Sequence, residues 1–183
     1  MKVLIVYGTR FGATKGIAER MTEWLNDNNI DSDIINVKKN QWPELVHYRG
    51  LIVGTGIKIG QWTKEIKNFM KKKKEEINAF GGPKVFFVSS GYAAIPERYQ
   101  EIKDEYCKKA LEGLGVKIDN YEAFGGVMDV SPDSPVSWLN KRILKIAGKS
   151  SPIFDPKGVN DYRDWNKIEL FTKEFIQAVK KVD

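Results

Sequence analysis

A glycine- and threonine-rich turn at residues 8–14 is the segment of this sequence best suited to binding an anion. It reads GTRFGAT and directly follows the apolar run VLIVY of residues 3–7. Such a run is typical of a parallel strand buried on both faces, and a helix must begin after the turn. Free backbone N–H groups, the hydroxyls of Thr9 and Thr14 and the helix dipole all favour an anion there. The turn predicts a phosphate-binding loop; an ordinary strand-to-helix turn is the alternative.

Two common phosphate motifs are absent from this turn. No Lys-Ser or Lys-Thr pair follows Gly12, so the GxxxxGK[ST] loop of nucleoside triphosphate sites is not present. The spacing of Gly8 and Gly12 does not fit the GxGxxG motif of dinucleotide sites. The phosphate is therefore expected to belong to another kind of ligand.

Length and composition limit the organisation of the chain. With 183 residues, 42% of them hydrophobic and 11% aromatic, the chain can bury one core, so we expect one domain spanning residues 1–183. The single cysteine, Cys107, excludes an internal disulfide and a CxxC metal motif, and we expect it to pack in a helix. We expect no metal. No signal peptide precedes the first strand and no apolar run reaches the roughly 18 residues of a membrane-spanning helix. We therefore expect a protein that is either cytoplasmic or peripheral at the cytoplasmic face of a membrane.

The charge of the chain favours anionic partners. The formal net charge is +6 and the isoelectric point is near 9.2. Lipid headgroups, acidic proteins, nucleic acid and a substrate bearing propionates all carry the complementary charge. Composition alone leaves these classes open.

Hydrophobic patterns predict strands that alternate with helices. The strands are expected at residues 3–7, 33–37, 51–54, 84–89 and 116–124. Helical spacing of apolar residues is expected between them, at residues 17–25, 66–77 and 99–114, and in a closing helix at 165–179. This alternation favours an α/β fold with a doubly wound parallel sheet, whose ligands bind beyond the carboxyl ends of the strands.

Two further loops at those carboxyl ends are small, glycine-bearing and hydroxyl-bearing. TGIKIGQW at residues 55–62 follows the third predicted strand, and SSGYAA at residues 89–94 follows the fourth. Each loop alone is a weak signal, because glycine and serine are common in loops. Together with the turn at residues 8–14, in this order, they are fairly specific.

With these three loops the sequence resembles the flavodoxin family over essentially its whole length. The first loop is similar to the family's T-x-[ST]-G-x-T pattern, with Thr9, Gly12 and Thr14 in place and Phe11 where a hydroxyl residue is usual. The resemblance implies a flavodoxin-like, doubly wound, five-stranded parallel sheet of order 2-1-3-4-5 and the cofactor flavin mononucleotide, FMN. Because Phe11 lacks a hydroxyl, one hydrogen bond to the phosphate is in question.

The resemblance also implies which residues bind the cofactor. The phosphate would lie at the first loop and the isoalloxazine ring between the other two, with backbone N–H groups of Gly56, Gly60 or Gly91 near its polar edge. Tyr92 or Trp62 would stack on the ring, although either residue is also a candidate for simple packing. The implied cofactor-binding residues are Thr9, Arg10, Phe11, Gly12, Ala13, Thr14, Thr55, Gly56, Ile57, Lys58, Ile59, Gly60, Trp62, Ser89, Ser90, Gly91 and Tyr92.

The charge of the three loops separates this chain from acidic flavodoxins. The loops contain no Asp or Glu, and their charged residues are Arg10 and Lys58. A cation a few ångströms away in a partly excluded site stabilises a neighbouring anion by about 1 to 4 kcal/mol. We therefore expect a less negative reduction potential for the bound flavin than in an acidic flavodoxin.

Residues 127–160 form an insertion near strand five. Ser134 and Pro135 predict a helix start, and the following VSWLNKRILKIAGK is amphipathic. Its apolar side is expected to carry Val136, Leu139, Ile143, Leu144, Ile146 and Ala147, and its basic side Lys141, Arg142, Lys145 and Lys149 with Trp138. Residues 135–149 would lie in a membrane interface, cover a groove beside the cofactor, or pack on the sheet.

Three kinds of function fit these observations. The first is an FMN-binding electron carrier with a redox partner such as a ferredoxin. The second follows from the insertion and the basic loops, which look most like the flavodoxin-type menaquinone-dependent protoporphyrinogen dehydrogenase subgroup. That resemblance implies oxidation of a porphyrinogen, electron transfer to quinone at the membrane face, and a role in heme biosynthesis. The third kind of function is an interaction module that uses the fold without a cofactor. Neither family likeness implies nucleic acid as a partner. No catalytic residue can be assigned, because His47, the single histidine, is expected at the edge of the sheet opposite the three loops.

Overall fold

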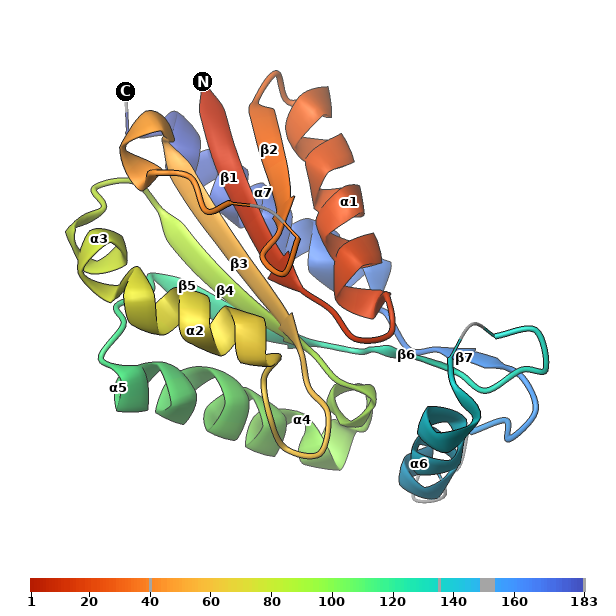
Figure 1. Cartoon of the computed structure of the whole chain (residues 1–183). Helices are drawn as coiled ribbons and strands as arrows, with labels where there is room; N and C mark the ends of the chain where they lie inside the picture. The colour runs from red at the N-terminus through yellow and green to blue at the C-terminus, as the bar shows by residue number, and fades with distance from the viewer. Residues whose placement is uncertain (40, 135, 149–153, 183) are drawn as a thin grey trace.

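The computed structural model describes residues 1–39, 41–134, 136–148 and 154–182 and has a parallel sheet at its centre (Figure 1). The sheet has five strands in the order β2-β1-β3-β4-β5. This confirms the predicted fold class and order. The strands are β1 (Lys2–Gly8), β2 (Asp31–Asn36), β3 (Gly50–Gly56), β4 (Lys84–Ser89) and β5 (Asn120–Phe124).

The central strands are apolar because helices cover both faces of the sheet. In β1 the side chains of Leu4 and Ile5 point to opposite faces, and both are fully buried. Leu4 stands opposite Asp33 of β2 and Leu51 of β3, which fixes the parallel register. All six residues of β4 are buried as well.

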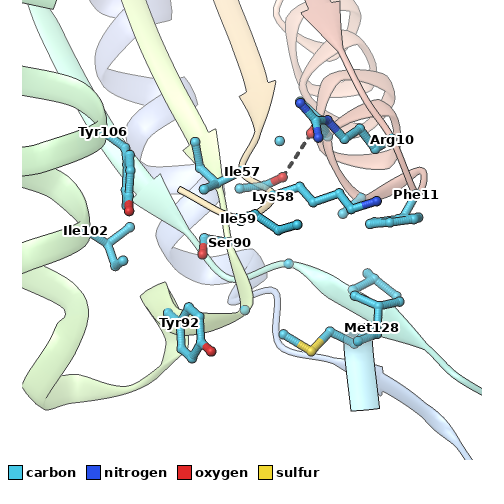
Figure 2. A pocket seen from close by; sticks show the side chains of 18 of the residues that line it. Arg10, Phe11, Ile57, Lys58, Ile59, Ser90, Tyr92, Ile102, Tyr106 and Met128 are labelled. Carbon is cyan, nitrogen blue, oxygen red and sulfur yellow. Dashed lines mark hydrogen bonds between the residues drawn. The ribbon is translucent and has the colours of Figure 1, made fainter. Parts of the chain in front are cut away.

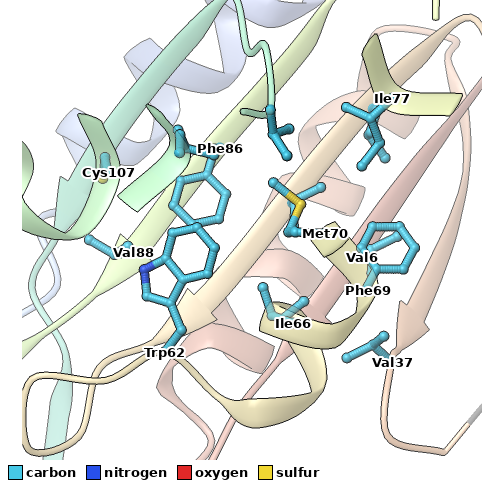
Figure 3. Close-up of a cluster of buried hydrophobic side chains, with 14 of the residues drawn as sticks. Val6, Val37, Trp62, Ile66, Phe69, Met70, Ile77, Phe86, Val88 and Cys107 are labelled. Carbon is cyan, nitrogen blue, oxygen red and sulfur yellow. The ribbon is translucent and has the colours of Figure 1, made fainter. Parts of the chain in front are cut away.

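Two helical layers enclose the sheet (Figure 1). α1 (Ala13–Asp27) and α7 (Trp165–Lys180) contribute to one core cluster, together with the β1 residues Val3 and Ile5. α2 (Lys64–Lys72), α3 (Lys74–Ala79), α4 (Pro96–Lys103) and α5 (Ala110–Leu114) lie over the other face. In that second cluster Trp62 packs against Phe86 at a ring distance of 4.7 Å (Figure 3).

Several predicted boundaries differ from the structure, and two of the differences affect how an element packs. The helix predicted over residues 66–77 is divided at Lys73 into α2 and α3. The strand predicted over residues 116–124 begins only at Asn120, because the preceding residues bond to the helical layer. Val116 N–H donates to Leu111 O at 3.1 Å, and Lys117 N–H donates to Asn78 Oδ1 at 2.8 Å.

Short helical segments complete this part of the fold. η1 (Leu45–His47) precedes β3 and leaves His47 exposed, at the amino end of that strand as expected. η2 (Gly91–Ala94) follows β4, and the π-helical segment η3 (Asp104–Lys109) joins α4 to α5. Cys107 is fully buried in η3, and burial raises the pKa of its thiol. The thiol packs in the core and donates a hydrogen bond to the backbone carbonyl of Glu122 at 3.6 Å.

The insertion follows β5 and does not interrupt it. It contains β6 (Val127–Asp129), α6 (Trp138–Gly148) and β7 (Val159–Asp161), with β6 and β7 antiparallel. Figure 1 shows α6 beyond the carboxyl ends of the strands, not on the face of the sheet. α6 begins at Trp138, and Ser137 Oγ accepts a hydrogen bond from Asn140 N–H at 3.4 Å, so the helix starts later than Ser134. Pro135 and Lys149, both part of the sequence prediction, lie outside the described residues.

Candidate functional site

A cleft of about 400 Å³ lies at the carboxyl ends of β1, β3 and β4, and its size is in the range of small-molecule sites (Figure 2). The three predicted loops and α6 surround it. Of the residues expected to bind the cofactor, these line the cleft: Thr9, Arg10, Phe11, Ala13, Thr14, Gly56, Ile57, Lys58, Ile59, Gly60, Ser89, Ser90, Gly91 and Tyr92. The sequence therefore predicted most of the residues that line one side of this cleft, although they come from segments up to about eighty residues apart in the chain.

The start of α1 forms the anion-binding end of the cleft. Gly12 is the N-cap with φ of 92°, a left-handed conformation that glycine adopts without strain. Gly12 N–H donates to Thr9 Oγ1 at 2.9 Å, which closes the turn. No side chain within the described part of the chain caps the first turn of α1, and that turn contains no acidic residue. Its N–H groups and the helix dipole therefore suit a phosphate.

Hydroxyl groups join the loops beneath the cleft. Thr14 Oγ1 and Ser89 Oγ share a buried hydrogen bond of 2.9 Å, which links α1 to the end of β4. Thr55 is fully buried, and its Oγ1 accepts from Thr63 N–H at 3.1 Å. Thr55 therefore supports the loop from below, and like Gly12 it does not line the cleft.

The structure separates the two aromatic candidates for stacking on the ring. Trp62 lies in the core against Phe86, and its Nε1 donates to Tyr106 O at 2.8 Å. It does not line the cleft, so the packing alternative holds for Trp62. Tyr92 lines the wall, and the guanidinium of Arg98 lies 4.4 Å from its ring centroid. Of the two candidates for stacking, Tyr92 is therefore the one that lines the cleft.

Arg10 and Lys58 lie on the same side of the cleft (Figure 2). Arg10 donates to the backbone carbonyl of Trp62 at 3.0 Å, so its position is fixed by the second loop. Lys58 Nζ lies 2.6 Å from Asn140 Oδ1 of α6 and 5.2 Å from the Phe11 ring centroid. Lys58 therefore connects the first two loops with the insertion. The electropositive surroundings expected from the sequence are present in the folded chain.

Sequence reasoning missed part of the wall. The additional lining residues are Arg98, Ile102, Tyr106, Gly126, Val127, Met128, Ile143, Leu144 and Ile146. The apolar side of the amphipathic helix was the signal for the last three, and covering a groove was one of its three interpretations. Nothing in the sequence indicated Met128 or Arg98, because their positions depend on how β6 and α4 approach the loops.

A close approach brings the insertion to the third loop. A Cβ on Gly91 would lie 2.1 Å from Cε of Met128, so a side chain at this position would require the end of the Met128 side chain to move. Gly126 also lies close to this loop, since a Cβ there would lie 3.2 Å from Gly91 N. The absence of a side chain at Gly91 therefore lets Met128 of β6 pack against the third loop in the wall of the cleft.

An ionic network on β5 supports the structure near the cleft without lining it. Glu122 accepts from the hydroxyl of Tyr99 and from Ala123 N–H, and it pairs with Lys103 at 3.1 Å and Lys167 at 3.3 Å. Burial would raise the pKa of Glu122, but these hydrogen bonds and charges together hold it below its ordinary value. Burial lowers the pKa of Lys167 despite its acidic partner. Within the residues that the structure describes, no three His, Cys, Asp or Glu side chains are grouped to hold a metal ion.

Comparisons with known proteins place this geometry in a family. The model of the flavodoxin domain matches residues 4–150. The chain is 25% identical over 182 residues to protoporphyrinogen IX dehydrogenase [quinone] of Escherichia coli K12, covering 99% of this chain and 98% of that protein. The protein of the same name from Leishmania major is 23% identical over 95% of this chain and 74% of its own length.

A solved structure supports the same fold. A cysteine-to-serine mutant of flavodoxin from Pseudomonas aeruginosa superposes with a TM-score of 0.59 at 14% identity, covering 98% of this chain and 99% of that one. The match of the family model, the sheet order and the loops agree, and they imply the cofactor FMN. The chain therefore belongs to the flavodoxin domain family, as a redox protein that transfers electrons through FMN.

Proposed function

We propose that the cleft between the three loops holds FMN. The first turn of α1 with Thr9 and Thr14 would hold the phosphate, and the loops at residues 56–60 and 89–92 would hold the ring, with Tyr92 against its face. The observation that carries this proposal is the N-terminus of α1, uncapped by a described side chain, opening into a cleft that continues to an aromatic wall. Bound flavin supplies the capacity to accept and release electrons reversibly.

The protein's own contribution is to orient the cofactor and control what reaches it. Gly56, Gly60 and Gly91 line the cleft, and without a Cβ they would let their backbone N–H groups come close to the ring. Lys58 and Arg10 favour the negative charge that reduction adds. Met128, Ile143 and Leu144 form an apolar wall that excludes water on the side of the insertion.

As an electron carrier, the protein would exchange electrons with a redox partner such as a ferredoxin. The flavodoxin domain, with a sheet that places three loops around one cofactor, supports this version. It requires only that the edge of the flavin can come close to a partner. No substrate pocket beyond the cofactor is needed.

A specific observation favours a second version, in which the protein is an FMN-dependent dehydrogenase of protoporphyrinogen IX that passes electrons to quinone. Both relatives carry that activity in their names, and the alignment to the Escherichia coli protein spans nearly the whole chain, including the insertion. The insertion here walls the cleft with apolar side chains of α6, and Lys58, Arg10 and Arg98 lie around it. An apolar wall with cations suits a flat tetrapyrrole that bears carboxylates.

Two measurements test these proposals in order. Purified protein should be yellow and release FMN in a one-to-one ratio, and Thr14→Val should weaken FMN binding while Thr22→Val, on the same helix away from the cleft, should not. Protein that takes up no FMN would contradict both versions. Anaerobic stopped-flow reduction by protoporphyrinogen, compared with reduction by a reduced ferredoxin, then separates dehydrogenase from carrier. Rapid reduction by ferredoxin, with no reduction by protoporphyrinogen, would support the electron carrier and contradict the dehydrogenase.

The same proposal includes the organisation and location of the chain. Residues 1–183 would form one domain with an insertion at 127–160, and residues 135–149 would contact the cytoplasmic face of a membrane peripherally. In the described residues no helix is long and apolar enough to cross a bilayer, so any membrane contact through these helices would be superficial. Basic and apolar residues of α6 support such a contact.

A further inference from the structure

One face of the α4–η3 segment forms a wall of the cleft that neither the three loops nor the insertion supplies. Arg98, Ile102 and Tyr106 are spaced four residues apart, and all three line the cleft. Figure 2 shows Ile102 and Tyr106 on the side of the cleft opposite Arg10. The helical layer over the sheet therefore reaches the cleft directly.

The backbone at Tyr106 is held in place by the core. Its carbonyl accepts a hydrogen bond from Nε1 of Trp62 at 2.8 Å, and Trp62 in turn packs against Phe86. The next residue, Cys107, is fully buried. Tyr106 belongs to the π-helical segment η3, and such segments are frequent at functional sites. The side chain of Tyr106 therefore starts from a fixed point and extends to the cleft.

The hydroxyl of Tyr106 lies against the second loop. A Cβ on Gly60 would lie 3.2 Å from the hydroxyl oxygen, so this oxygen is beside the backbone of the glycine. The side chain is half-buried, and within the described residues its hydroxyl makes no hydrogen bond. Phenylalanine would pack equally well at this position, so packing alone does not account for the hydroxyl. A half-buried hydroxyl is best satisfied by a ligand that supplies the missing hydrogen bond.

Ser90 carries a second hydroxyl of this kind. Its backbone bonds to Phe124 and Ala93, but its hydroxyl, which lines the cleft, makes no hydrogen bond in the described part of the chain. The other polar side chains of the lining have partners among hydrogen bonds or ring contacts: Thr9, Arg10, Thr14, Lys58, Ser89, Tyr92 and Arg98. We call Ser90 and Tyr106 the hydroxyl pair.

The surroundings of the hydroxyl pair favour the polar edge of a planar ring. A hydroxyl donates one hydrogen bond and accepts others, so it can pair with a ring carbonyl or a ring N–H. Among the described residues no Asp or Glu lines the cleft, and Arg98 on this wall already donates to Glu101 at 3.0 Å. Ile57 and Ile102 lie beside Tyr106 (Figure 2), and such apolar side chains suit the face of a ring.

From these observations we propose that the hydroxyl pair binds the polar edge of the flavin ring, with Tyr106 adding a contact from the helical layer to those of the three loops. This inference rests on the proposed binding of FMN. The carbonyl oxygens of that edge gain negative charge when the flavin is reduced, and a hydrogen bond to a charged acceptor is stronger. Tyr106 therefore binds the reduced flavin more tightly than the oxidised flavin and raises its potential.

Titration of Tyr106→Phe with two flavins tests the contact. The variant keeps the ring, so its melting temperature should be close to that of the wild type. Loss of one hydrogen bond should raise the Kd of oxidised FMN about fivefold, and the Kd of riboflavin, which lacks the phosphate, by the same factor. Ser90→Ala should act in the same way. Thr14→Val, at the phosphate end, should weaken FMN binding and leave riboflavin binding nearly unchanged.

Redox titration gives a readout that packing would not change. In Tyr106→Phe the Kd of reduced FMN should rise about tenfold more than the Kd of oxidised FMN, which makes the two-electron potential about 30 mV more negative. Tyr121→Phe removes a hydroxyl on β5, outside the cleft lining, and should change neither affinity nor potential. Tyr106→Leu removes the ring as well and should weaken both flavins further.

The outcomes separate this inference from the proposed function. Equal losses for FMN and riboflavin in Tyr106→Phe, with a more negative potential, support the contact. A Tyr106→Phe variant that matches the wild type in affinity and potential, while Tyr106→Leu is weak, reduces Tyr106 to packing and leaves FMN binding intact. A loss confined to FMN would place the hydroxyl at the phosphate and overturn the contact with the ring. Wild-type protein that takes up no flavin contradicts both proposals.

Discussion

The sheet with its helices and the insertion are stabilised by different interactions. Around the sheet, fully buried side chains such as Phe86 and Phe87 form continuous apolar clusters on both faces. The insertion buries few apolar residues in its described part and is joined by polar contacts, above all those of the buried Asn160. Asn160 bonds to the backbone of Asp155 and to the carbonyl of Met128.

This difference assigns separate roles to the two regions: the sheet holds the loops in place, and the insertion controls access to the cleft. A close-packed sheet fixes the ends of β1, β3 and β4, so the loops that surround the cleft start from fixed points. The insertion, with three-residue strands and a largely exposed helix, contributes the outer wall. We therefore expect the global stability to come from the sheet region and the control of access to come from the insertion.

The largest effect is expected in the core. Phe86→Ala removes a fully buried ring that contacts Trp62, and it should lower the free energy of unfolding by about 3 to 5 kcal/mol. Equilibrium denaturation would measure the loss. Leu139→Ala on the exposed face of α6 should change the free energy of unfolding by less than about 0.5 kcal/mol. Equal losses from both variants would contradict the assignment of stability to the sheet.

A variant at Glu122 tests whether polar contacts within the sheet region contribute to the free energy of global unfolding. Glu122→Gln removes the charge that pairs with Lys103 and Lys167, and it should lower the free energy of unfolding by about 2 kcal/mol near pH 7. Because the pKa of Glu122 is below its ordinary value of 4.5 in the folded state, the unfolded state binds more protons. The wild-type advantage is therefore present above that value and lost as the pH falls through the folded pKa. Denaturation from pH 3 to pH 7 would show the two curves converge in acid; parallel curves would contradict this role.

A smaller and local effect is expected at Asn160. Asn160→Ala breaks bonds of 2.7 Å and 2.9 Å with the backbone of Asp155, at a cost of about 1 to 2 kcal/mol. Hydrogen exchange should accelerate at residues 127–129 and 159–161 and stay unchanged in β1, β3 and β4. Asn120→Ala, which removes an exposed contact with Glu174, is the control. Faster exchange throughout the sheet would show that the insertion is part of the global cooperative unit.

The sequence predicted the sheet region better than the insertion for the same physical reason. Continuous apolar runs such as residues 3–7 and 84–89 permit little besides buried parallel strands, and the loops after them share one edge by geometry. Fourteen of the expected cofactor-binding residues line the cleft as a result. Trp62 was ambiguous because an aromatic after a strand suits either a stack or a core, and only packing against Phe86 decides between them.

For the insertion, the sequence predicted a helix but not where that helix packs. Its amphipathic helix was visible, but periodicity does not say what an apolar side covers. In the structure Leu144 is buried at the cleft, whereas Leu139 and Ile146, expected on the same side, are mostly exposed. The contact of Met128 with Gly91 depends on tertiary approach, and the positive φ of 49° at Ile59 depends on the local backbone, so no sequence pattern indicated either of them.

Lys58 joins the two regions, and its charge gives the smallest expected effect. Its ammonium lies between Phe11 of the first loop and Asn140 of α6, beside the end of the cleft proposed above for the flavin ring. Lys58→Glu replaces a cation by an anion where reduction adds negative charge. Solvent screens this half-exposed site, so about 1 kcal/mol remains, which makes the two-electron potential of the bound flavin about 20 mV more negative.

Redox titration of FMN-loaded protein measures this shift, and two variants show where it comes from. Asn140→Leu keeps the charge of Lys58 but removes its partner on α6, so it should change the potential less than Lys58→Glu does. Lys39→Glu makes the same charge change beyond β2, outside the cleft lining, and should leave the potential nearly unchanged. A potential unmoved in Lys58→Glu would mean that the cation does not act on the flavin, and the role of Lys58 would then reduce to holding α6 against the second loop.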